Sequence, residues 1–145
     1  MFAATTCVFL AFVAPSQADG GELHPISATV KQTLTENGGN TARPFTLIVN
    51  IKSDSPQGIV KEYRGAAAKT KTEEGNIRYD LHRSAADKTE FVLVEQWKSL
   101  DALDSHLHQD YTIQFVEYLQ ANATIELTVL RPVPAKAPKK RAEAE

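Results

Sequence analysis

Apolar and polar side chains alternate along four stretches of this chain. Residues 45–51, 77–83 and 91–97 place every second side chain on one face, which is the period of a β-strand. Residues 124–132 repeat the pattern later in the sequence. In residues 91–97 both alternating sets contain large apolar side chains. We therefore expect this strand to be covered on both of its faces.

Helical spacing fills the intervals between these strands. Ser55 and Pro56 suit the cap position and the first turn of a helix. The residues expected on the buried face of this helix are Ile59, Tyr63, Ala66, Ala67 and Thr70. A leucine at every third or fourth position predicts a second helix over 99–107, and a third helical piece follows at about 110–121.

These elements follow one another as strand, helix, strand, strand, helix, strand. The polar stretch 84–90 is short enough to join the second and third strands as a hairpin. This order is that of a split βαβ, ferredoxin-like α+β domain. We place the domain at residues 45–133.

Three segments lie outside this domain. Residues 1–18 hold an apolar run that ends in small residues, which is typical of a signal peptide cleaved after Ala18, although no Lys or Arg precedes the run. This predicts a secreted or periplasmic protein; the alternative is a cytoplasmic protein with a wrongly assigned start or a buried first segment. Residues 19–44 are expected to form a linker or loosely docked arm, and residues 134–145 a disordered tail.

Composition narrows the classes of partner. The 145 residues have a formal net charge of -2 and no basic stripe, so we expect no nucleic-acid partner. We expect no stable insertion in a membrane once the signal peptide is removed. The single cysteine, Cys7, lies in the predicted signal peptide 1–18, and the sequence has no zinc-type spacing and no glycine-rich phosphate loop. The sequence thus contains no motif for a zinc site or for a phosphate-bearing cofactor.

Three pieces of the sequence together resemble one known family. These are "EEGNIRYDLHR" over 73–83, "FVLVEQWKSLDALDSHL" over 91–107, and Tyr111 shortly after. They are similar to the antibiotic biosynthesis monooxygenase family, and within it to the quinol monooxygenase-like proteins. The resemblance implies a homodimer in which two sheets meet face to face as a dimeric α+β barrel. It also implies a pocket between sheet and helices, in which a small phenolic or quinol-like substrate is oxidised by O2 without a cofactor.

Four residues are candidates for that pocket. His106 is the candidate catalytic base, because an imidazole can accept a proton near neutral pH. Trp97 would form a flat apolar wall, and Asn50 would orient a substrate oxygen. Tyr111 stands where quinol monooxygenase-like relatives often have a histidine; a tyrosine can donate a hydrogen bond but is a poor base at neutral pH.

Each candidate also has a purely structural interpretation. Trp97 could simply close the core, and Asn50 could satisfy a loop. His106 could pair with a nearby carboxylate; the candidates for this are Asp101, Asp104 and Asp110.

Two other functions are compatible with the same family resemblance. A haem-degrading relative would share Asn50, but Val116 occupies the position of the iron-ligating histidine and cannot coordinate a metal. A non-oxygenase barrel that binds or isomerises a small oxygenated metabolite is the other alternative, because "EEGNIRYDL" also resembles an isomerase branch. We expect a cofactor-independent monooxygenase first and the non-oxygenase barrel second.

Overall fold

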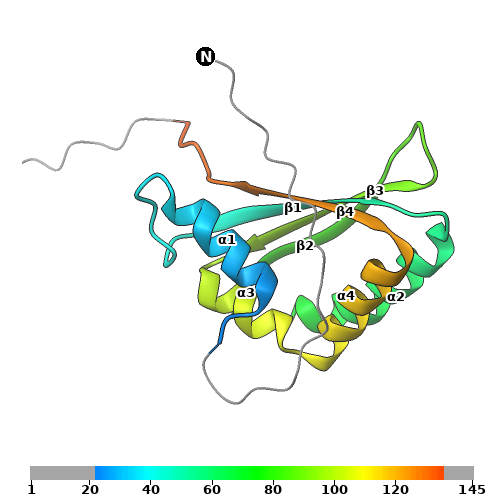
Figure 1. Cartoon of the computed structure of the whole chain (residues 1–145), viewed down its shortest axis with the longest axis horizontal. Coiled ribbons are helices and arrows are strands. Elements are labelled where there is room, and N and C mark those ends of the chain that lie inside the picture. Colours follow the sequence, from blue (N-terminus) through cyan, green and yellow to red (C-terminus); the bar gives the residue numbers. More distant parts are fainter. Residues whose placement is uncertain (1–21, 136–145) are drawn as a thin grey trace, which may run out of the picture.

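The computed structural model describes residues 22–135 and contains one antiparallel sheet with helices packed against it (Figure 1). Its elements are α1 (Pro25–Thr35), β1 (Phe45–Lys52), α2 (Pro56–Thr70), β2 (Asn76–Arg83), β3 (Glu90–Trp97), α3 (Leu100–Leu107), α4 (Asp110–Asn122) and β4 (Thr124–Leu130). The strands lie in the order β2-β3-β1-β4. This confirms the predicted α+β, ferredoxin-like domain.

The helices lie on one face of the sheet, and alternation along the strands decides which side chains they cover (Figure 1). The covered set on β1 is Phe45, Leu47, Val49 and Ile51, and each of these is at most 6% exposed. The opposite face presents Ile48, Val92 and Val94, which are half-buried, and no described element covers them. The sheet therefore has a second apolar face.

Short polar side chains fix the connections beside the sheet. Ser55 occupies the cap position of α2 as expected, but its side chain makes no capping hydrogen bond. Ser53, just after β1, fixes the connection instead: its hydroxyl donates to the carbonyl of Asn122 at 2.7 Å and accepts from the backbone N–H of Ser55 at 3.0 Å. Ser99 caps α3 by accepting from the N–H of Ala102 at 3.2 Å.

The expectation of a linker or loosely docked arm at residues 19–44 is wrong for helix α1. Ile26, Val30 and Leu34 lie four residues apart, form one apolar face and join the main core, and Val30 is fully buried. This face packs against α3 and β4. Polar residues and glycines around the helix dilute the signal, although the three apolar positions are visible in the sequence.

The two terminal segments predicted from the sequence lie wholly or mostly outside the described residues. The signal peptide predicted at 1–18 is entirely outside them, and so is most of the tail at 134–145. Residues 134 and 135 of that tail have no regular secondary structure. Within residues 22–135, no helix is both long and apolar enough to cross a membrane.

Candidate functional site

The candidate base, His106, is enclosed by aromatic side chains. Helix α3 turns its leucines toward the sheet, and His106 is buried beside them at 1% exposure. The centroid of its ring lies 4.6 Å from that of Trp97 and 5.5 Å from that of Tyr79. Both aromatic residues come from neighbouring strands and point toward the helices. The imidazole thus sits against the inner face of the sheet.

A carboxylate from another part of the chain binds this imidazole. The Nδ1 atom of His106 lies 2.8 Å from Oε1 of Glu73, which follows helix α2. The hydroxyl of Tyr111 donates to the same oxygen at 2.6 Å. A carboxylate accepts hydrogen bonds, so the Nδ1 atom beside Glu73 carries the ring proton. The lone pair of the neutral imidazole then lies on Nε2. A carboxylate and imidazole arranged in this way form a base whose tautomer is fixed.

Burial and charge act in opposite directions on this histidine. Burial lowers the pKa of His106 below its ordinary value, and the hydrogen bond and charge of Glu73 oppose the shift. Burial dominates, so the imidazole is neutral and able to accept a proton at neutral pH. The Thr112 hydroxyl lies 3.3 Å from Nδ1 and 3.5 Å from Nε2 and is the nearest polar group from α4.

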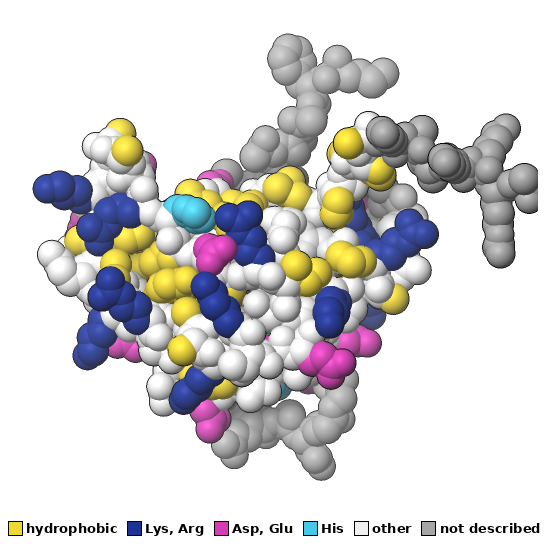
Figure 2. All heavy atoms as spheres, turned by 180° about the vertical axis from the view of Figure 1, so that it is seen from behind, with side chains coloured by type: hydrophobic (Ala, Val, Ile, Leu, Met, Phe, Trp, Pro, Cys, Tyr) yellow, Lys and Arg dark blue, Asp and Glu magenta, His cyan; other side chains and the backbone are white. Residues whose placement is uncertain are grey.

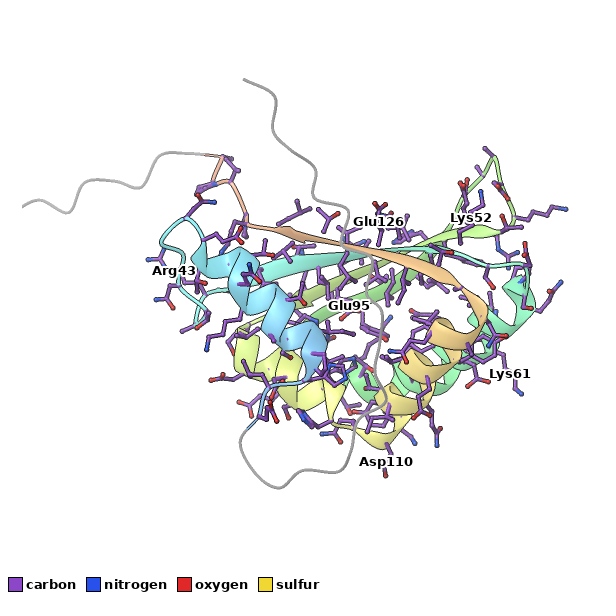
Figure 3. All side chains as sticks on the ribbon, in the orientation of Figure 1. Arg43, Lys52, Lys61, Glu95, Asp110 and Glu126 are labelled. Atoms are coloured by element: carbon purple, nitrogen blue, oxygen red, sulfur yellow. The ribbon has the colours of Figure 1, made fainter. Side chains whose placement is uncertain are left out.

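A second carboxyl group, Glu95, lies within the same core. It is 6% exposed, and the indole N–H of Trp97 donates to its Oε2 at 2.9 Å. Figure 3 shows Glu95 in the space between sheet and helices. Burial raises the pKa of Glu95 to about 7, the charge of Glu73 adds to the shift, and the Trp97 hydrogen bond opposes it. This group therefore changes its charge near neutral pH.

Glu95 and Glu73 were not among the candidates from the sequence. Glu95 had a signal, because it falls in the inward phase of a strand whose other inward residues are apolar. Glu73 had a weaker one: it begins the "EEGN" turn of the family resemblance, 33 positions from the histidine that it binds. None of the aspartates considered as partners of His106 takes that place; Asp104 instead accepts from the backbone N–H of His24 at 2.9 Å.

The structure brings three of the four predicted site residues together. Trp97 and Tyr111 both flank His106, with ring centroids 4.6 and 6.4 Å from its own. Asn50 does not join them. It lies between Val49 and Ile51, which point toward the helices, so its side chain is on the opposite face of the sheet. This corrects the expectation that Asn50 lines the same pocket.

The cluster is closed on most sides. Tyr79, Trp97 and Thr112 are each at most 1% exposed. Among the residues in contact with the imidazole, Glu73 and Tyr111 are the ones that reach the surface. The ammonium group of Lys69 lies 5.3 Å from the centroid of the Tyr111 ring. His106 is therefore enclosed, and Glu73 and Tyr111 form the part of its surroundings that lies nearest the surface.

The described residues offer no group of three or more His, Cys, Asp or Glu side chains that could hold a metal ion. The polar groups of the cluster are instead paired with one another. Within residues 22–135, this cluster offers a buried acid, the carboxyl group of Glu95, and a buried base, the imidazole of His106.

Comparison with known proteins identifies the domain. Residues 48–118 match the sequence model of the family described as antibiotic biosynthesis monooxygenase. This segment, 71 of the 145 residues, is therefore similar to that family. The "Putative monooxygenase YcnE" of Bacillus subtilis (strain 168) is 28% identical over 58 residues, which are 40% of this chain and 61% of YcnE. The match thus spans less than two thirds of that relative. Helix α1 lies outside the residues that match the family.

Solved structures agree with the fold. PA3566 from Pseudomonas aeruginosa is 26% identical with a TM-score of 0.60, and the match covers 66% of this chain and 100% of PA3566. Rv0793 from Mycobacterium tuberculosis is also 26% identical, with a TM-score of 0.59 and coverage of 65% and 99%. SnoaB from Streptomyces nogalater, a cofactor-independent oxygenase, is 20% identical with a TM-score of 0.56 and coverage of 69% and 100%. At that identity SnoaB supports the fold alone.

Proposed function

We propose that this protein is a cofactor-independent monooxygenase that oxidises a quinol or polyphenol, with His106 as the catalytic base. The observation that carries the proposal is the buried pair of Glu73 and His106, joined at 2.8 Å. A neutral imidazole with a fixed tautomer, set among aromatic rings, suits the removal of a proton from a phenol. The similarity of residues 48–118 to the antibiotic biosynthesis monooxygenase family supports the reaction class.

The reaction needs no electron source other than its substrate. Nε2 of His106 accepts the phenolic proton, and the electron-rich anion passes one electron to O2. The resulting radical and superoxide combine at a ring carbon that carries a hydrogen, and the imidazolium returns its proton to the peroxide anion to give a hydroperoxide. The hydroperoxide then loses water, which takes the hydrogen of that carbon, and a carbonyl remains on the ring. One oxygen atom enters the product and the other leaves as water, so substrate and O2 account for every electron.

The neighbouring residues have separate roles in this proposal. Trp97 offers the flat wall of the site and holds the carboxyl group of Glu95. Glu73 positions the imidazole and fixes its tautomer. Tyr111 contacts the imidazole and is partly exposed, so we propose that the substrate enters past this side chain. A planar substrate would displace the Tyr111 ring and stack in its place.

Oxygen uptake tests the proposal. Purified protein without added cofactor should consume O2 with at least one member of a panel of quinols. His106→Ala should lower this rate by about 100-fold to 10,000-fold, the range for loss of a general base. His82→Ala is the matched control, because His82 is exposed on β2, and it should leave the rate unchanged.

Thermal unfolding of each variant separates chemistry from folding. If folded His106→Ala retains the rate of the unchanged protein, the base role is wrong. Should that variant unfold, His106→Asn provides the second comparison, since it keeps a polar side chain at this buried position.

One observation favours the second candidate, a barrel that isomerises a small oxygenated metabolite. Glu95, with a pKa of about 7, and neutral His106 both contact Trp97, so an acid and a base share one wall. Such a pair can move a proton between two positions of a substrate. Turnover of a substrate without any O2 uptake would favour this function over the oxygenase.

A further inference from the structure

A separate hollow lies on the surface where α2 meets the end of β2. Its volume is about 390 Å³, and it is lined by Gln57, Val60, Lys61, Arg64 and Arg83. The four residues from α2 are spaced three, one and three positions apart, so they share one face of that helix. Figure 2 shows this side of the molecule, where Lys and Arg side chains border a hydrophobic area. None of these residues belongs to the His106 cluster.

The hollow has an excess of positive charge. Its lining contains three cations and no acid. Within the described part of the chain, no carboxylate lies within ion-pair distance of Lys61, Arg64 or Arg83. The acids of the adjacent hairpin are engaged elsewhere: Asp80 pairs with Lys71 and Arg78, and Asp87 and Glu90 pair with Lys52. A positive patch is therefore left in a chain whose net charge is -2.

Part of this patch is already ordered. The guanidinium carbon of Arg83 lies 4.9 Å from the centroid of the Phe91 ring, and Phe91 is 2% exposed. Stacking on a buried ring restricts the arginine side chain, so less freedom is lost when it binds a ligand. The planar guanidinium can offer two parallel N–H groups to an oxyanion. Half-buried Val60 adds apolar surface beside it.

We infer that this hollow is a binding site for an organic anion, in which a carboxylate, sulfate or sulfonate group is attached to an apolar body. Arg83 and Arg64 bind the acidic group, Lys61 adds charge, and the apolar body rests on Val60. An inorganic anion lacks the apolar contact, and a neutral aromatic compound lacks the ion pairs. This site is independent of the function proposed for His106.

Titration with 1-naphthalenesulfonate, followed by NMR of the backbone amides, tests the inference. Saturable shifts should appear at 57–64 and around Arg83, and the affinity should fall as NaCl is added. Inorganic sulfate and 2-naphthalenemethanol should each bind at least about tenfold more weakly, since each offers half of the contacts.

Single charge-removing variants locate the binding. Arg83→Gln and Arg64→Gln should each weaken binding about tenfold, because each removes a charge-assisted hydrogen bond. Lys98→Gln is the matched control, an exposed lysine outside the lining, and should not change the affinity. Arg64→Gln changes an exposed helical position, so it serves even if Arg83→Gln disturbs the fold.

Three results would overturn the assignment. These are the absence of saturable shifts at about 10 mM probe, well above the concentration that a specific site requires; equal binding of the sulfonate and the neutral alcohol; and equal binding of the sulfonate and inorganic sulfate. Unaltered affinity in both arginine variants would also contradict it.

Discussion

At the scale of single residues, the site depends on two carboxyl groups with unequal surroundings. Glu73 is partly exposed and accepts hydrogen bonds from His106 and Tyr111. Glu95 is buried under the helices and accepts a hydrogen bond from the indole of Trp97. Burial without a cation penalises the charged form, so Glu95 holds its proton until the pH approaches 7.

Glu95→Gln should therefore remove a pH-dependent loss of stability. The pKa of Glu95 is raised from 4.5 to about 7 on folding, so its contribution is fully present below pH 4.5 and is lost as the pH rises through 7. Glutamine keeps an oxygen for Trp97 but does not ionise. At pH 8 the variant should be more stable by up to about 3 kcal/mol, from 1.36 kcal/mol per pKa unit. Chemical denaturation at pH 5 and pH 8 measures this, and an unchanged difference between the two pH values would contradict it.

The sequence predicts the local half of this site and not the distant half. Trp97, His106 and Tyr111 lie within 15 positions, so strand and helix periods suffice to bring them to one region. Glu73 reaches His106 from a turn that approaches α3 closely: a side chain at Gly75 would overlap that of Ala102. Such a contact depends on how close two elements approach, which periodicity does not determine. The prediction for Asn50 was wrong although periodicity does determine its position: strand alternation places it on the face opposite to Val49 and Ile51.

At the scale of elements, helix α1 is fastened to the domain at both ends. At its start, Nδ1 of His24 accepts from the N–H of Ile26 at 3.2 Å, and the backbone N–H of His24 donates to Asp104 on α3 at 2.9 Å. After its end, the guanidinium of Arg131 donates to three carbonyls of the loop that follows, including that of Asn40 at 2.6 Å. These contacts explain why a polar segment is docked.

The cap at His24 should make α1 sensitive to acid. Burial lowers the pKa of His24, the nearby His108 adds to this, and Asp104 opposes it. With a folded pKa below 6.5, the stabilisation is present above pH 6.5 and is lost as the pH falls through the folded pKa, when Nδ1 can no longer accept. Amide hydrogen exchange in 26–35, corrected for its intrinsic pH dependence, should then rise about fivefold, as expected for a cap worth about 1 kcal/mol.

His24→Asn is the variant that tests this directly, because asparagine caps a helix without titrating. Its α1 amides should show no extra exchange in acid. His82→Asn is the matched control on the exposed strand β2 and should behave as the unchanged protein does. Equal acid sensitivity in all three proteins would assign the effect to groups other than His24.

At the scale of the whole molecule, the uncovered face of the sheet calls for a partner. Ile48, Val92 and Val94 lie side by side there through the pairing of β1 with β3. An antiparallel sheet with apolar residues on both faces needs a second layer on each. We propose that a second copy of the chain provides it, as the resemblance to a dimeric barrel implies.

Light scattering at micromolar concentration should therefore give the mass of a homodimer. Val94→Arg puts a charge at the centre of the face and should yield a monomer, while Lys98→Glu, outside it, should remain dimeric. A monomeric unchanged protein would refute the barrel assembly without bearing on the fold of one chain.

The base role of His106 is tested most directly by ionisation of a bound quinol in the absence of oxygen. The probe is the quinol that gives the fastest oxygen uptake, and its phenolate absorbance is followed against pH under anaerobic conditions. Free phenols ionise near pH 10. In the complex with the unchanged protein the phenolate should form at a lower pH than in the complex with His106→Ala, because the imidazole takes up the phenolic proton. The same titration curve in both complexes would contradict a proton transfer to His106.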